Sequence, residues 1–386
     1  QKKISHELIN DDADIVIGAN LGDEGKGSVV ASLTKATDGE VLNVLTNGGS
    51  QRAHSILTED GSFTFKHFGS GTYHGADSYY SRFFIINPMQ FVKEYNELTE
   101  RGISLKGKIF CDPRVRWSTP YDMMANQIIE HLRGENKHGS CGMGIWETVL
   151  RCHHSLTEDA VKFAVFVNMP LMDKLAYLTK VKKYYDKRIG SIPKEWLTIW
   201  NSPTLALHFI EDCQFMYDNI TLMMQEEFSF RSEHYERVIF ENGQGLMLNS
   251  TGKDIAGTTP SSTGCFESMA IAYSMGIKNS NVHYVTRPYM TRHGRGFLDK
   301  ENKRNEISSG IQMDRTNHYN IFQEDFRYAP LDINELNNRI TDDYKKCRLG
   351  KPKLILDVTH CDEMDRVDEF KKHFINVNTY DDALIK

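Results

Sequence analysis

Short β-branched apolar runs alternate with polar loops along much of the chain. The run at 15–18 predicts a buried strand, the glycine-rich stretch at 19–27 a loop, and the spacing at 28–34 a helix. Strand, glycine-rich loop and helix in this order are typical of nucleotide-binding α/β folds. Ligands of open parallel sheets bind at the carboxyl ends of the strands, so we expect the polar loops there to form the site. Further strands are predicted at 41–45, 83–86, 238–240, 282–286 and 354–358.

Helical spacing dominates the middle of the chain. Pro88 is expected to begin a helix over 89–101, because proline suits the first helical turn. Residues 158–230 are mostly helical by their spacing and carry a lysine-rich face, which we interpret as solvated. We therefore predict an α/β fold with a mostly parallel central sheet flanked by helices. The chain is expected to form a single domain over residues 1–386, with a helical insertion at approximately 155–235.

Composition narrows the class of protein. The chain has 386 residues, of which 40% are hydrophobic and 25% charged, as in an ordinary globular protein. A net charge of -6 argues against a general nucleic-acid binder. The seven cysteines are scattered without a C-x-x-C pair, which indicates reduced thiols and disfavours a zinc site. No apolar run approaches the roughly 20 residues of a membrane helix, and residues 1–14 are too polar for a signal peptide. We expect a cytoplasmic protein without nucleic-acid or membrane partners.

The loop Gly22-Asp23-Glu24-Gly25-Lys26-Gly27 carries the sharpest chemical signal. Its glycines allow backbone N–H groups to surround phosphate oxygens, and the following helix adds its positive end. The lysine can reach a phosphate as a point charge. The loop is not a Walker A motif, because glycine and not Ser or Thr follows the lysine. Two carboxylates repel phosphate unless one binds Mg²⁺ or takes a proton, so the loop predicts phosphate chemistry that involves a metal or a base.

This loop resembles the signature of the adenylosuccinate synthetase family, and further motifs follow in the family's order. The family's G-G-x-N-A-G-H-T motif is similar to Gly48-Gly49-Ser50-Gln51-Arg52-Ala53-His54-Ser55, and its G-T-T-G-x-G loop is similar to residues 138–144. Three shorter motifs also have counterparts: E-G-A-Q-G at 241–245, G-T-Y-P-x-x-T at 257–263 and T-R-V-G at 291–294. The resemblance implies a fold like that of P-loop NTPases. It also implies a Mg²⁺-dependent ligase that joins L-aspartate to C6 of a purine nucleoside monophosphate, with a nucleoside triphosphate as phosphoryl donor.

The resemblance also implies roles for particular residues. Asp23 would be the base and a Mg²⁺ ligand, with the backbone carbonyl of Ala53 as second protein ligand. Lys26 would stabilise the transferred phosphoryl group, and His54 would act as an acid that steadies charge on O6. Arg292 and Arg327 are the best candidates for the carboxylates of aspartate, since guanidinium binds carboxylate bidentately. The implied nucleotide-binding residues are Asn20, Gly22, Glu24, Gly25, Gly27, Ser28, Gln51, Ser140, Cys141, Arg151, Gln244, Thr263 and Asp362.

Arg151 resembles an arginine that reaches the phosphate held by the neighbouring subunit, which implies a homodimer. Other positions depart from the family. The family's arginine-rich loop, which precedes W-L-D, corresponds to residues 326–332 of this chain, where only one arginine is present. The family's T-K-x-D motif, which reads guanine, appears here as Thr359-His360-Cys361-Asp362. Gln51 and Arg52 stand where Asn-Ala is usual, and the C-terminal S-x-G-P-x-R finds no match. The sequence therefore resembles a shortened, divergent member.

Shortened members of the family include bacteriophage enzymes that use dGMP in place of IMP. On this interpretation the reaction is dGMP, L-aspartate and ATP or dATP giving 2-amino-2′-deoxyadenylosuccinate for 2-aminoadenine DNA, in the host cytoplasm. The alternative is ordinary adenylosuccinate synthesis from IMP, L-aspartate and GTP. A third interpretation is a non-catalytic nucleotide-binding protein. The missing arginines and the altered base-reading motif favour dGMP, and the joint presence of Asp23, Lys26 and His54 disfavours the third interpretation.

Overall fold

We describe the chain from a computed structural model. The residues that the structure describes are 12–59, 61–153, 161–230, 234–249, 259–307, 311, 325–348 and 350–381. The start of the predicted helical insertion, 155–160, and the first residues of the 257–263 motif lie outside these ranges.

A nine-stranded sheet forms the centre of the fold, in the order β15-β14-β11-β1-β10-β2-β5-β7-β9. Every pairing between neighbours in it is parallel, so the carboxyl ends of these strands lie along one edge. The predicted α/β class with a mostly parallel sheet is therefore confirmed. The strands are β1 (Asp12–Gly18), β2 (Val41–Leu45), β5 (Asp77–Tyr80), β7 (Ile109–Cys111), β9 (Thr221–Leu222), β10 (Arg237–Gly245), β11 (Asn279–Thr286), β14 (Lys353–Val358) and β15 (Val377–Thr379).

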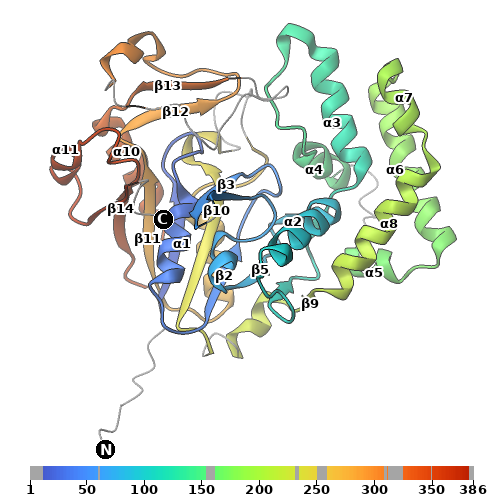
Figure 1. Ribbon diagram of the computed structural model, residues 1–386, viewed down its shortest axis with the longest axis horizontal. Helices are drawn as coiled ribbons and strands as arrows, with labels where there is room; N and C mark the ends of the chain where they lie inside the picture. The colour runs from blue at the N-terminus through green and yellow to red at the C-terminus, as the bar shows by residue number, and fades with distance from the viewer. Residues whose placement is uncertain are drawn as a thin grey trace, which may run out of the picture.

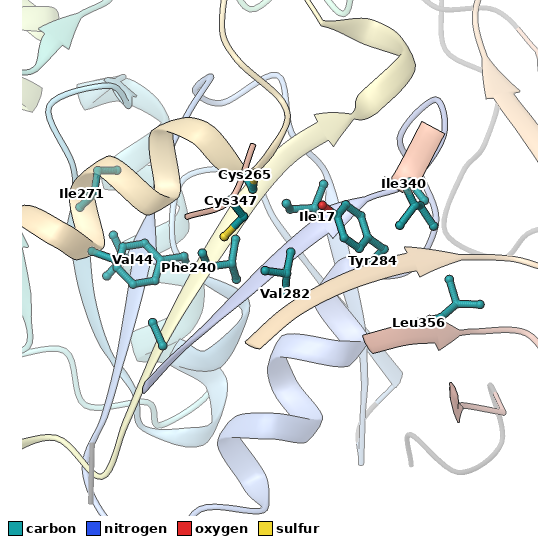
Figure 2. Close-up of a cluster of buried hydrophobic side chains, with 14 of the residues drawn as sticks. Ile17, Val44, Phe240, Cys265, Ile271, Val282, Tyr284, Ile340, Cys347 and Leu356 are labelled. Carbon is teal, nitrogen blue, oxygen red and sulfur yellow. The ribbon is translucent and has the colours of Figure 1, made fainter. Parts of the chain in front are cut away.

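The central strands are apolar on both faces because helices cover both. From β1, Val16 packs on one face with Val29 of α1 (Lys26–Lys35). Ile15 and Ile17 point to the other face, toward α9 (Cys265–Ser274) and α10 (Ile333–Tyr344). Figure 2 shows this second cluster, with Ile17, Phe240, Val282 and Leu356 from the strands, Ile271 from α9 and Ile340 from α10. Burial on both faces explains the unbroken apolar runs at 15–17 in β1 and 238–240 in β10.

The remaining helices gather mainly at one end of the sheet. Figure 1 shows α3 to α8 on the right of the view, beyond the β9 edge, and α10 and α11 on the left. They are α2 (Pro88–Glu100), α3 (Pro120–Arg133), α4 (Ile145–His153), α5 (Phe163–Asn168), α6 (Leu171–Ile189), α7 (Lys194–Trp200), α8 (Pro203–Asp218) and α11 (Val367–Lys371). Among the described residues, none of the helices combines the length and the apolar character needed to cross a membrane.

Three small two-stranded sheets complete the fold. They pair β3 (His54–Thr58) with β4 (Gly61–Phe65), β6 (Ile85–Ile86) with β8 (Arg116–Trp117), and β12 (Tyr289–His293) with β13 (Phe326–Pro330). The first and third are antiparallel and the second is parallel. Short 3₁₀ helices include η1 (Ser70–His74), η2 (Gly134–Asn136), η4 (Gln225–Phe230), η6 (Leu246–Leu248) and η7 (Glu301–Glu306).

Several element boundaries differ from the sequence-based expectation. The strand predicted at 83–86 is only β6, and it pairs with β8 outside the central sheet. The strand beside β2 is β5, whose residues 77–80 are not an aliphatic run. Helix α1 begins at Lys26, two residues before the predicted start at 28. Helices α5 to α8 fulfil the helical expectation for 158–230, but residues 221–222 return to the sheet as β9. The division into a domain and an insertion stays a prediction.

Candidate active site

The predicted phosphate loop joins the end of β1 to the start of α1 and folds around an internal ion pair. Glu24 Oε1 accepts hydrogen bonds from the backbone N–H of Asn20 and of Gly22, each at 2.9 Å. Glu24 Oε2 lies 3.1 Å from Lys26 Nζ, and both side chains are only 2% exposed. Burial raises the pKa of Glu24, and the charge of Lys26 opposes that rise. In this structure Glu24 therefore closes the loop, and Lys26 lies beneath it and not at its surface.

Three side chains from distant parts of the chain fasten this loop from outside. Arg287 Nε donates to the carbonyl of Asp23 at 2.7 Å, and Thr359 Oγ1 donates to the carbonyl of Glu24 at 2.6 Å. Arg339 Nε donates to the carbonyl of Ala19 at 2.8 Å. Gly25 adopts a φ of 95° at the start of α1, and a Cβ on it would lie 2.9 Å from the Thr359 side chain. The left-handed φ and this close approach together explain glycine at that position.

A buried carboxylate, Glu241 in the middle of β10, organises the second part of the site. It accepts from His54 Nδ1 and from Arg52 Nη2, each at 2.6 Å. It also accepts from the backbone N–H of Ser70 at 2.9 Å and from Ser70 Oγ at 2.5 Å. Glu241 thus joins β10, the segment that leads into β3, and η1. The sequence motifs predict a role for His54, but they indicate none for Glu241, Arg52 or Ser70.

The charges in this cluster set the state of the imidazole. Burial would raise the pKa of Glu241, but the charge of Arg52 and the hydrogen bond from His54 hold it well below its usual range. Burial lowers the pKa of His54 to about 3, and the charge of Arg52 adds to that effect. Glu241 is therefore ionised and His54 neutral, with Nδ1–H donating to Glu241 and a lone pair on Nε2. Acting as an acid would require His54 to gain a proton when an anionic group binds.

Several buried polar atoms near this cluster find no hydrogen-bond partner among the described residues. They are Ser50 Oγ, both amide atoms of Gln51, Nε and Nη1 of Arg52, Gln244 Oε1 and Thr263 Oγ1. Gln51 Nε2 and Gln244 Oε1 both lie beside Gly48, where a Cβ would be 2.8 and 3.0 Å from them. Unpaired buried polar groups cost free energy, so this set is suited to a polar ligand that pairs with them.

The loop at 138–144 packs against α3 and close to the turn after β12. Ser140 Oγ donates to Asn126 Oδ1 at 3.0 Å, and the N–H of Gly139 donates to Glu130 at 3.0 Å. A Cβ on Gly139 would lie 2.9 Å from the backbone nitrogen of Arg295. Ser140 and Cys141 are half-buried. Asp362 lies at the surface, in the turn that follows β14.

Three predicted anion-binding arginines are instead paired within the chain. Arg151 is 4% exposed, and its Nε and Nη2 bind the two carboxylate oxygens of Asp122 at 2.7 and 2.9 Å. Arg292 and Arg327 face each other across β12 and β13. Arg327 Nη2 donates to the carbonyls of Gly294 and Gly296, each at 2.7 Å, and Arg292 Nη1 donates to that of Phe297 at 2.7 Å. In this structure Arg151 serves the helical region, and the other two hold the turn after β12.

The predicted Mg²⁺ ligands fit the metal in chemistry but do not enclose it. Asp23 offers carboxylate oxygens and Ala53 a backbone carbonyl, and hard oxygen donors are what Mg²⁺ prefers. Asp23 is half-exposed and Ala53 is exposed. Among the described residues, no group of three or more His, Cys, Asp or Glu side chains could hold a metal ion. The donor set therefore suits an ion that completes its coordination with water and substrate phosphates.

Two solved structures resemble this chain in fold. Fully ligated adenylosuccinate synthetase from Plasmodium falciparum superimposes with a TM-score of 0.66 at 16% identity, covering 92% of this chain and 78% of that one. Cyanophage S-2L succinoaminodeoxyadenylate synthetase, bound to dGMP and dATP, gives a TM-score of 0.60 at 11% identity, covering 97% and 91%. At these identities the likeness establishes the fold alone.

Curated sequences give a closer comparison. Adenylosuccinate synthetase of Prochlorococcus marinus (strain MIT 9515) is 26% identical over 295 residues, which cover 73% of this chain and 62% of the relative. The Lactobacillus acidophilus enzyme is also 26% identical over 295 residues, covering 74% and 64%. The match thus spans less than two thirds of the length of these relatives. The family model of adenylosuccinate synthetase matches residues 15–320, and the chain belongs to this family.

Proposed function

We propose that this protein is a ligase that joins L-aspartate to C6 of a 6-oxopurine nucleoside monophosphate through a 6-phosphoryl intermediate. The observation that carries the proposal is the set of unpaired buried atoms on Gln51, Gln244, Arg52 and Thr263. Two unpaired amides beside Gly48 suit the hydrogen-bonding edge of a purine. A guanidinium and a hydroxyl suit anionic oxygens. The glycine-rich loop and the Glu241–His54 pair adjoin the same edge of the sheet.

The chemistry needs activation because the 6-oxo group of a purine is a poor leaving group. Asp23 removes the proton from N1, and O6 then attacks the terminal phosphorus of the donor, from which the nucleoside diphosphate leaves. The amine of aspartate attacks C6, the C6–O6 bond breaks, inorganic phosphate leaves, and the amine loses a proton. Lys26, once it parts from Glu24, and His54, once it gains a proton on Nε2, bind the oxygens on which charge develops. Mg²⁺, when bound at Asp23 and Ala53, neutralises the charge of the donor phosphates.

We propose dGMP as the monophosphate, with ATP or dATP as donor. Guanine carries a 2-amino donor that hypoxanthine lacks, so the site needs an acceptor near C2. The carbonyl of Asn20 in the phosphate loop already accepts from the N–H of Met247 at 2.9 Å. Gln51 Oε1 is a buried acceptor without a partner among the described residues, at a position where the family usually has Asn. We therefore assign the 2-amino group to Gln51.

Fold likeness does not decide between dGMP and IMP. The TM-score is higher with the Plasmodium enzyme, whereas the comparison with the phage enzyme covers more of both chains. The support for dGMP lies in Gln51, whereas the replacement of the family's base-reading lysine by His360 bears on the base of the phosphoryl donor. Ordinary synthesis from IMP and GTP is the alternative that the experiment must separate.

A substrate matrix tests the proposal. IMP, GMP and dGMP are each combined with ATP, dATP or GTP, with aspartate present, and turnover is followed by the ultraviolet shift of the 6-amino product and by phosphate release. We expect kcat/KM to rank dGMP above IMP, by about 10-fold or more, because an unpaired buried acceptor costs about 1–3 kcal/mol. Gln51→Asn, the family residue, should reduce that preference. Turnover of IMP without turnover of dGMP would assign the alternative, and no turnover of any pair would contradict ligase activity.

The oligomeric state is a separate proposal. The predicted homodimer depended on Arg151 reaching a neighbouring subunit, and the ion pair with Asp122 uses that side chain within the chain. We keep the homodimer as a proposal and expect sedimentation to give twice the mass of 44.3 kDa. If an Arg151→Met variant bound the nucleoside monophosphate with the affinity of the parent, this arginine would not act on the phosphate across an interface.

A further inference from the structure

The carboxylate proposed as the base belongs to a residue with an unusual backbone. Asp23 has a φ of 39°, in the left-handed region that residues other than glycine adopt at some cost. Such a conformation persists where surrounding contacts hold it. One contact to the peptide of Asp23 comes from Arg287, whose Nε donates to the Asp23 carbonyl at 2.7 Å. Arg287 stands just after β11, outside the phosphate loop.

Arg287 is itself held firmly on its other side. It is 4% exposed, and its Nη1 donates to the hydroxyl of Tyr289 at 3.2 Å. The guanidinium carbon lies 5.4 Å from the ring centre of Phe326 and 5.8 Å from that of Tyr289. Tyr289 donates a short hydrogen bond to the Glu363 carboxylate. Burial raises the pKa of Tyr289, which therefore stays a protonated donor.

We propose that Arg287 is a positioning residue for Asp23, and that Tyr289 and Glu363 set the position of Arg287. We call this chain of contacts the Arg287 relay. It links the carbonyl of Asp23 to the turn after β14, where Asp362 is expected to meet the base of the phosphoryl donor. The inference rests on the proposed function, because only there are Asp23 and Asp362 given catalytic and binding roles. Its consequence is that the turn that meets the donor base also helps to orient the base that activates the acceptor.

A second contact runs between the same two regions. Thr359 Oγ1 donates to the carbonyl of Glu24 at 2.6 Å, so consecutive carbonyls of the phosphate loop are held from the ends of β11 and β14. The backbone N–H of Thr359 donates to the carbonyl of Thr286 at 2.9 Å, which ties these two strand ends together. The phosphate loop, β11 and β14 thus form a single hydrogen-bonded unit around Asp23.

The chain offers a matched control in Arg366. Its Nη1 donates to the carbonyls of Pro288 at 3.1 Å and Leu331 at 3.0 Å, and its Nη2 pairs with Glu369 at 2.7 Å. Arg366 therefore ties backbone carbonyls in the same corner of the fold, including the residue next to Arg287. None of these three contacts reaches the phosphate loop. A purely structural loss in this corner should appear in Arg366→Met as well as in Arg287→Met.

The test compares Arg287→Met, Arg287→Lys, Arg366→Met, Tyr289→Phe and the double variant Arg287→Met/Tyr289→Phe. We expect Arg287→Met to lower kcat by about 10- to 100-fold, the range that a lost charged hydrogen bond gives, with KM for the monophosphate within about threefold. Arg287→Lys, which keeps one donor, should recover part of kcat. Arg366→Met should keep the parent kcat. Tyr289→Phe as a single variant should lower kcat. In the double variant it should cause no loss beyond that of Arg287→Met, because Tyr289 acts through Arg287.

Hydrogen exchange of the peptide over 19–27 provides a readout that does not depend on turnover. We expect faster exchange in Arg287→Met and parent-like exchange in Arg366→Met. Parent-like kcat or exchange in Arg287→Met would overturn the positioning role, and an equal loss in Arg366→Met would reduce it to general stability. Additive effects in the double variant would overturn the link to Tyr289 and Glu363. If the parent turned over no substrate pair, the proposed function would fail, and the exchange measurement would still decide whether Arg287 holds the loop.

Discussion

Replacing Glu241 by Gln should destabilise the protein strongly, because this carboxylate compensates a buried charge. Glu241 is fully buried, and Arg52, 2.6 Å away, is 2% exposed. The substitution keeps the size of the side chain and removes its charge. The guanidinium of Arg52 would then remain buried without a counter-charge. The hydrogen bonds from Ser70 and His54 would be weakened as well, since charge-assisted hydrogen bonds are about twice as strong as neutral ones.

The size of the effect follows from this burial. Removing one partner of a buried ion pair costs about 3–5 kcal/mol. Unfolding entropy grows with chain length, so in a chain of 386 residues that loss lowers Tm by about 4–6 °C. Arg52→Ala also breaks the pair but leaves Glu241 with its three other hydrogen bonds. The double variant removes both charges and should therefore lose less than the sum of the two single losses.

Thermal unfolding of the parent, the two single variants and the double variant measures these terms. We expect Glu241→Gln to be the less stable single variant, and Arg52→Ala to restore part of its loss. A Glu241→Gln variant within about 1 °C of the parent would refute the reasoning, since it would mean that Arg52 needs no counter-charge. Additive losses would show that the two residues do not compensate each other.

Three further predictions concern the base, the imidazole and a buried histidine. Asp23→Asn should lower kcat by about 10²–10⁴-fold with nucleotide binding kept, and steady-state rates within about threefold of the parent would contradict the assignment. His54→Ala should lower kcat by about 10²–10³-fold and change KM little, because its hydrogen bond strengthens as charge develops; an effect confined to KM would make it a binding residue. Burial lowers the pKa of His283, but its hydrogen bonds to Asp14 and Asp357 raise it to about 9. Because the pKa of His283 is higher in the folded protein than the unfolded value of 6.5, its protonation adds about 3 kcal/mol to the free energy of unfolding. This stabilisation is fully present below pH 6.5 and is lost as pH rises through 9. Tm should fall over that range in the parent and not in His283→Gln, and parallel curves would show that His283 is not charged.

The aliphatic strands could be predicted because their buried positions are consecutive apolar residues in the sequence. The segments 15–17 and 238–240 are covered on both faces and therefore read as apolar runs. The strand at 77–80 could not be found in the same way, since Asp77 and Ser78 begin it. Its place in the sheet comes from pairing with β2 and β7, which no local pattern records.

The loops of the site were visible as motifs, but their internal pairing was not. Glu241 and His54 lie 187 residues apart, and spacing alone does not join them. The exposed-looking Arg151 is buried because Asp122, 29 residues earlier, neutralises it. Arg52 stood out as a departure from the family, and its partner became evident only when β10 and the segment before β3 were seen together. Sequence motifs thus indicate which groups gather, and the fold decides which of them neutralise one another.

The order of strands in the sheet also constrains how the chain can fold during synthesis. Ala13 of β1 lies opposite Val238 of β10 on one side and Ser280 of β11 on the other. Both neighbours of the first strand therefore leave the ribosome long after it does. Strand pairings so distant in sequence form slowly, and strands are prone to aggregate until their partners have been synthesised. The phosphate loop cannot be assembled until β11 has emerged, so nascent chains that stop before residue 279 should need chaperones and bind no nucleotide.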